Sequence, residues 1–191
     1  MILSNISYES AALGDESMHE QTIKNLMAAF AGESMARNKY DMWADKAEEE
    51  GLIRVAHFFR ETARNEHYHA RELLKLAQDG IGETLTNLQK AREGEEYEHT
   101  EMYPEFAKQA REVGDKKAAV LFELIAKVEQ EHDARYAELL RQLEEDQLYE
   151  REEKEYWICE DCGHIHYGKK PPRNCPICKA PQGKFNLKPG Y

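Results

Sequence analysis

The sequence predicts an all-α antiparallel four-helix bundle, followed by a small C-terminal domain that holds a metal on four cysteines. Apolar residues recur at steps of three and four from about residue 19 to residue 148, which is the period of a helix and not of a strand. All the cysteines of the chain lie in its last 33 residues, and such clustering marks a separate metal-binding module. We therefore expect two domains of different kinds.

Glycines divide the helical region into four segments. Gly51, Gly114 and the pair Gly80 and Gly82 stand where glycine commonly ends a helix. The predicted helices cover residues 19–50, 52–79, 83–113 and 115–148. The predicted domains are an N-terminal arm (1–18), the bundle (19–148), a charged and solvated linker (149–155) and the four-cysteine domain (156–191).

The composition argues against several classes of function. The 191 residues include 26 Lys and Arg against 37 Asp and Glu, a net charge of −11, whereas nucleic-acid binding needs a basic surface. No apolar run approaches the roughly 18 residues that predict a membrane span. The N-terminus has no basic segment of the kind that begins a signal peptide. We therefore expect a cytoplasmic protein that binds neither nucleic acid nor membranes.

The bundle contains an internal repeat. At an offset of 63 residues the second half reproduces landmarks of the first: Tyr40/Tyr103, Gly51/Gly114, Phe59/Phe122, Glu66/Glu129 and His69/His132. Upstream, Gly32-Glu33 matches Gly94-Glu95 at an offset of only 62, so one extra residue lies between Glu95 and Tyr103. Because an α-helix absorbs a single insertion as a π-bulge, we predict i→i+5 bonding in that interval.

Two Glu-x-x-His motifs supply candidate metal ligands. Glu66 with His69, and Glu129 with His132, each place a carboxylate and an imidazole on one helix face. Further glutamates come from the first and third helices: Glu33, Glu95 and Glu98. One such motif alone is an ordinary solvated helix face, but two copies at the repeat offset match the ligand set of ferritin-like dinuclear bundles. Carboxylates bridge hard cations and imidazole suits iron, so we predict a dinuclear iron site.

Three aromatic or imidazole side chains lie near these ligands. Tyr40 and Tyr103 are repeat-related, one to two turns from the ligand glutamates, and we expect core packing together with a hydrogen bond to a ligand carboxylate. The remaining histidines have no repeat partner and are not predicted as ligands, and His99 is the least easily set aside of them because it directly follows Glu98.

The cysteines form two knuckles that predict a tetrahedral thiolate site. The motifs are Cys159-x-x-Cys162-Gly and Cys175-Pro-x-Cys178, and twelve residues separate Cys162 from Cys175. This spacing is typical of a mononuclear metal site rather than of disulfides. The ligands alone do not separate iron from zinc: zinc would be structural, and iron would carry one electron.

Taken together, these residues resemble the rubrerythrin family. The resemblance covers about residues 19–187 and rests on five stretches: AFAGESMARNKY at 29–40, Glu61-Thr-Ala through Glu66-x-x-His69, GEEYEHTEMYP at 94–104, Glu129-x-x-His132, and the tail from Trp157 to Phe185. The departures are mild. Residue 164 is His where an aromatic is usual, and the connection from Asp79 to Glu83 is short, which leaves open whether helix hairpins are exchanged between subunits.

The resemblance implies a ferritin-like diiron bundle with a rubredoxin-like domain, and a peroxidase that reduces hydrogen peroxide to water in defence against oxidative stress. Electrons would pass from rubredoxin or another small donor with its reductase, through the tail iron, in a homodimer. The implied diiron ligands are seven: Glu33, Glu66, His69, Glu95, Glu98, Glu129 and His132. Glu66 and Glu129 would bridge, one iron would change partner between His69 and Glu98 with redox state, and Tyr40 and Tyr103 would stand beside the ligands.

Two other functions remain open from the sequence. The first is a ferritin-like ferroxidase that handles iron, although iron storage needs no electron input from a four-cysteine tail. The second is a metal-holding scaffold in which the tail is a structural zinc ribbon.

Overall fold

The computed structural model describes residues 18–77 and 80–188. The predicted N-terminal arm therefore lies outside the described residues, except for Met18. The chain divides into two compact units, residues 1–82 and residues 83–191, and each is described by itself.

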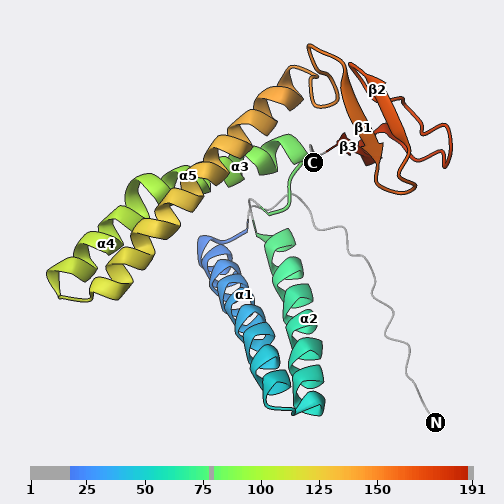
Figure 1. The fold of residues 1–191 in the computed structure, drawn as a ribbon. Helices are drawn as coiled ribbons and strands as arrows, with labels where there is room; N and C mark the ends of the chain where they lie inside the picture. The colour runs from blue at the N-terminus through green and yellow to red at the C-terminus, as the bar shows by residue number, and fades with distance from the viewer. Residues whose placement is uncertain (1–17, 78–79, 189–191) are drawn as a thin grey trace, which may run out of the picture. The chain divides into compact units, whose positions relative to one another are not determined.

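The first unit is a helical hairpin. Helix α1 (Glu20–Glu49) and helix α2 (Ile53–Leu76) run side by side (Figure 1). The turn between them uses Gly51, whose φ of 77° is in the left-handed region that glycine adopts without strain. Small side chains let the helices approach closely near this turn, because Ala44 and Ala56 are fully buried there.

The second unit begins with an interrupted helix. Helix α3 (Thr84–Tyr97) passes into the π-helical segment η1 (Glu98–Met102) and continues as α4 (Tyr103–Glu112). Helix α5 (Lys116–Glu144) returns alongside all of them (Figure 1). The predicted i→i+5 widening between Glu95 and Tyr103 is confirmed.

The two hairpins repeat each other in three dimensions. Tyr40 stacks on Phe59 with ring centroids 6.1 Å apart and planes at 30°, and Tyr103 meets Phe122 at 6.1 Å and 31°. Each pair is completed by an edge-on aromatic ring, Trp43 in the first hairpin and Phe106 in the second. The extra residue of the second hairpin is therefore absorbed before Tyr103.

Helix α5 ends earlier than residue 148. Its last residue is Glu144, and Asp146 follows in the left-handed region with a φ of 54°, which a helix cannot continue through. The next residues do not run free as a solvated linker. Tyr149 packs on the core of the C-terminal domain, and the amide of Arg151 donates to the carbonyl of Lys169 at 2.9 Å. Tyr149 is an aromatic residue within a charged segment, and the spacing of residues in the sequence did not predict that it packs on this core.

The C-terminal domain is a three-stranded antiparallel sheet in the order β2–β1–β3. Its strands are β1 (Glu155–Cys159), β2 (Ile165–Gly168) and β3 (Phe185–Leu187). The core is small and includes Trp157 and Phe185 beside two of the cysteines. A core of this size does not stabilise a domain by itself and needs an additional constraint, such as a bound metal. None of the helices in the described part of the chain is long and apolar enough to cross a membrane.

Candidate metal centres

Hairpin α1–α2 gathers three candidate ligands. Nδ1 of His69 lies 2.8 Å from Oε2 of Glu66, one turn earlier on the same helix, and 3.8 Å from Oε2 of Glu33 across the hairpin. One ligand atom of each residue falls within 4.8 Å of the others. Glu66 is the most enclosed, with 15% of its side chain exposed, against 59% for His69.

Hairpin α3–α5 builds the same half-site from the repeat-related residues. Nδ1 of His132 lies 2.6 Å from Oε2 of Glu129 and 3.8 Å from Oε1 of Glu95. These three residues again bring their ligand atoms within 4.8 Å of one another. The distances on the two sides of the repeat agree although the third helix carries the extra residue. The π segment therefore keeps Glu95 and Tyr103 both in the places that Glu33 and Tyr40 occupy.

The electrostatics of each half-site favour a cation. A hydrogen bond with Glu66 raises the pKa of Glu33, with burial and the charge of Glu66 adding to the shift. Burial raises the pKa of Glu95, and the charge of Glu129 adds to it. Carboxylates held this close disfavour their charged forms in the absence of a counterion. A divalent cation would offset this repulsion between the carboxylates. The glutamates and the histidine of each half-site therefore fit a bound metal ion.

Glu98 stands apart from these two groups. It is the first residue of the π segment, and it does not belong to a cluster of three ligands among the described residues. Tyr103, on the following turn, has its pKa raised by burial and then by the charges of Glu98, Glu129 and Glu95. The hydroxyl of Tyr103 thus keeps its proton beside the carboxylates. Tyr40 lies in the matching aromatic cluster of the first hairpin.

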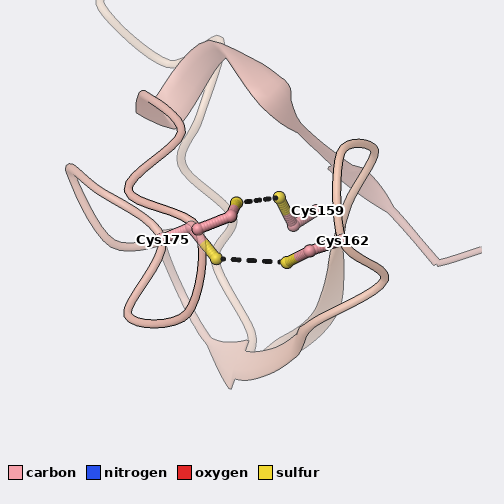
Figure 2. Close-up of side chains that lie close together, drawn as sticks. Cys159, Cys162 and Cys175 are labelled. Atoms are coloured by element: carbon pink, nitrogen blue, oxygen red, sulfur yellow. Dashed lines mark hydrogen bonds between the residues drawn. The ribbon is translucent and has the colours of Figure 1, made fainter.

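The four cysteines converge on one point. The sulfur of Cys159 lies 3.7 Å from that of Cys178, and the sulfur of Cys162 lies 3.5 Å from that of Cys175. Figure 2 shows the labelled Cys159, Cys162 and Cys175 with their sulfurs turned toward the same space. A tetrahedral metal with bonds of about 2.3 Å to sulfur would hold the sulfurs about 3.8 Å apart. The cysteines are free and far outside disulfide distance, so their geometry fits a metal site.

Backbone amides near the cysteines favour the ionised form of one of them, Cys175. Burial opposes ionisation of Cys175, but amides of Cys178 and Ile177 donate to its sulfur and, with neighbouring thiols, lower its pKa to about 7. The amide of His164 favours ionisation of Cys162, yet burial and the adjacent thiols outweigh it and raise its pKa to about 12. Four thiolates at this spacing therefore need a cation between them. His164 itself packs edge-on against Phe185, with centroids 6.5 Å apart.

A polar cluster beside the second half-site was not predicted from the sequence. Asp133, next to His132, receives a hydrogen bond from Arg92 and faces His99, the histidine singled out beside Glu98. The available signal was a break in the repeat, because residue 70 is alanine where residue 133 is aspartate.

Paired Glu-x-x-His hairpins and a four-cysteine module define a class: a helical diiron protein that carries a rubredoxin-like domain. The chain belongs to the rubrerythrin family. The family model described as Rubrerythrin matches residues 24–140, and the model described as the rubredoxin-like domain of rubrerythrin matches residues 157–186. Its cofactors are those of the family, a diiron site of glutamates and histidines and a mononuclear iron at the four cysteines.

Curated relatives match along most of their length. Rubrerythrin-1 of Clostridium acetobutylicum is 41% identical, over 87% of this chain and 94% of its own. Rubrerythrin of Porphyromonas gingivalis is also 41% identical, over 90% of this chain and 92% of its own. The solved structure of nigerythrin in a mixed-valence state covers 93% of this chain and 91% of its own, with 30% identity and a TM-score of 0.32.

Proposed function

We propose that this protein is a peroxidase that reduces hydrogen peroxide to water and protects a cytoplasm against oxidative stress. The observation that carries the proposal is the presence, in one chain, of two matching Glu-x-x-His half-sites and a four-cysteine metal site. When bound, the two irons supply the two electrons that cleavage of the O–O bond consumes. A ferroxidase that stores iron has no need for the four-cysteine domain.

The diiron site is proposed to form from both half-sites. Its ligands would be seven residues: Glu33, Glu66, His69, Glu95, Glu98, Glu129 and His132. Glu66 and Glu129 would bridge the two metals, because these carboxylates are the most enclosed of each cluster, at 15% exposure. Ionised carboxylates at these positions would offset the charge of the two cations.

Glu98 is proposed to bind only in the oxidised state, in exchange for His69. Ferric iron is harder than ferrous iron and prefers a carboxylate to an imidazole. The location of Glu98 in the π segment supports this role, since π-helical turns collect at functional sites. Its absence from the preformed ligand cluster also agrees with a carboxylate that binds in only one of two states.

Tyr103 is proposed to hold a proton beside the site, and Tyr40 to stand at the matching position beside the ligands of the first hairpin. The raised pKa of Tyr103 keeps its hydroxyl protonated, so this group can donate a hydrogen bond to a carboxylate or to a leaving oxygen. The stacked phenylalanines fix both rings against α2 and α5. Orientation by packing reduces the entropy that a proton donor would otherwise lose on reaction.

The electron donor is proposed to be an acidic small protein such as rubredoxin, acting with its reductase. Residues 156–191 contain six Lys and Arg against two Asp and Glu, while the remainder of the chain is strongly acidic. Complementary charge speeds the association of two proteins. The same contrast supports a homodimer in which the basic domain of one subunit approaches the acidic bundle of the other.

The test is anaerobic turnover of peroxide by the iron-loaded protein with reduced rubredoxin. We expect rapid, stoichiometric oxidation of the donor, and a red protein whose visible absorption bleaches on reduction. A colourless tail would instead identify a zinc ribbon, because zinc thiolates do not absorb visible light. Iron deposition without consumption of donor electrons would identify a ferroxidase.

A further inference from the structure

The second hairpin contains a polar network that has no counterpart at the matching positions of the first hairpin, within the residues that the structure describes. Nε of Arg92 donates to Oδ1 of Asp133 at 3.1 Å, and Nε2 of His99 lies 3.3 Å from Oδ2 of the same carboxylate. Asp133 and His99 are largely enclosed, with 20% and 15% of their side chains exposed. One aspartate on α5 thus holds a side chain from α3 and a side chain from the π segment.

The repeat identifies what occupies the same place in the first hairpin. Asp133 corresponds to Ala70 at the offset of 63, and Arg92 corresponds to Phe30 at the upstream offset of 62. Ala70 and Phe30 line a pocket of about 280 Å³ on the first hairpin, together with Arg37. The polar network is therefore found in the hairpin that has the π segment, and its uninterrupted counterpart has the apolar side chains of Ala70 and Phe30 at the matching positions.

The network lies next to two proposed ligands. His99 directly follows Glu98, and Asp133 directly follows His132. Arg92 lies in α3 before the π segment, and Thr100 within the segment donates its hydroxyl to the carbonyl of Glu96 at 2.6 Å. His99 thus ties the segment to α5, while the backbone of the segment departs from the regular α-helical ladder.

We infer that Asp133 is a positioning residue, which anchors the π segment through His99 and Arg92 and so sets where the carboxylate of Glu98 lies. A π-helical turn has looser backbone bonding than an α-helix. Without a fixed point it would shift in register, and Glu98 would move with it. Anchored at His99, the segment leaves the neighbouring Glu98 free to move by side-chain rotation alone. This inference rests on the proposed role of Glu98 as a ligand.

The first test uses metal-free full-length protein and needs no turnover. In Asp133→Ala we expect amide hydrogen exchange from Glu98 to Tyr103 to rise about tenfold or more, because two hydrogen bonds to a charged group are lost. Asp133→Asn keeps an oxygen for Arg92 and an amide for His99, and should restore most of the protection. The matched control is Glu123→Ala, which breaks the ion pair with Arg111 elsewhere on the same hairpin and should leave the segment unchanged.

The second test is the near-ultraviolet spectrum of the iron-loaded, oxidised protein. We expect Asp133→Ala to change this spectrum, because Glu98 no longer lies in its place among the ligands, while Asp133→Asn and Glu123→Ala retain it. Should Asp133→Ala not fold, His99→Ala removes one of the two contacts and gives the same comparison.

Two results would overturn the inference. One is exchange in Asp133→Ala that is unchanged, or raised equally along the whole hairpin. The other is a local rise in exchange with an unaltered spectrum, which would make Asp133 merely structural. Failure of the wild-type protein to turn over peroxide would refute the proposed function, and both readouts would remain interpretable.

Discussion

The backbone amide of Tyr103 donates to the carbonyl of Glu98, five residues earlier rather than four. This bond closes the π segment and absorbs the residue by which the third helix exceeds the first. On either side of the bond the repeat is preserved, with Glu95 facing His132 as Glu33 faces His69, at 3.8 Å in both cases. The insertion therefore changes the backbone only around Glu98. This glutamate belongs to neither cluster of three ligands, and no glutamate of the first hairpin matches it in the repeat.

Removing the extra residue should separate metal binding from catalysis. Deletion of Thr100 restores the spacing of the first hairpin, and we expect a continuous α-helix with unchanged iron content. Peroxide turnover should fall on the order of 100-fold, because Glu98 is misplaced. Thr100→Ala, which keeps the residue count, is the control and should retain turnover. Wild-type turnover in the deletion variant would mean that Glu98 is not needed.

The two kinds of metal site should be separable by single substitutions. Elemental analysis of the wild-type protein from an iron-replete host should give about three metals per chain, two from the diiron site and one from the four cysteines. Glu129→Ala should lose the bundle metals and keep the tail metal, and Cys162→Ser should do the reverse. Glu131→Ala, an exposed neighbour on α5, is the control. Loss of all metals from Glu129→Ala would show that the domains depend on each other.

The carboxylate cluster predicts a pH dependence for the metal-free protein. The pKa of Glu95 is raised in the folded state, so the stability it contributes is present at low pH and is lost as pH rises through that pKa. Glu95→Gln removes this loss. Thermal denaturation at neutral pH should therefore give a higher Tm for metal-free Glu95→Gln than for metal-free wild type, and below about pH 4 the gap should close.

The same substitution should act in the opposite direction once iron is bound, because a ligand has been removed. Glu96→Gln, on the exposed side of the same helix, serves as the control at both pH values. A Tm for metal-free Glu95→Gln that is lower than wild type at neutral pH would contradict the assignment of repulsion to this cluster.

Tyr149 should stabilise the four-cysteine domain although it precedes the first strand. Its ring packs on the core that contains Trp157 and Phe185. Because the ring is partly buried, Tyr149→Ala should cost about 1–2 kcal/mol. The measurement is the denaturant midpoint for loss of visible absorption at the cysteine site. Glu153→Ala, an exposed residue in the same segment, should leave that midpoint unchanged.

Donor docking should depend on salt. Raising salt from about 0.05 to about 0.5 M should slow turnover with rubredoxin several-fold, because screening removes the attraction between the basic domain and an acidic partner. Turnover with a small uncharged reductant should not change. Lys179→Glu should slow the protein donor similarly, and Lys117→Glu on α5 should not. Sedimentation at both salt concentrations would reveal whether dissociation of the proposed homodimer contributes.

The local features of this protein could be predicted from the sequence. Helical period, glycine punctuation and knuckle spacing act within a few residues, so they predicted four helices, a four-cysteine module and, through the change of offset from 62 to 63, the π segment. These signals need no knowledge of which distant side chains meet. The predicted ends of the helices were less accurate. The end of α5, for example, depends on the backbone conformation of Asp146 and on the packing of Tyr149.

Contacts between distant residues were decided only by the tertiary structure. Asp133 is one charged residue among many on a polar helix, and its meeting with Arg92 and His99 depends on the rotation of α5 against α3 and the π segment. Tyr149 lies in a charged segment whose spacing predicts no core, and it is partly buried because it packs on the core of the C-terminal domain. Repeats and ligand motifs can be recognised from the order of the residues. The partner of a single polar or aromatic side chain depends instead on how the helices and strands pack together.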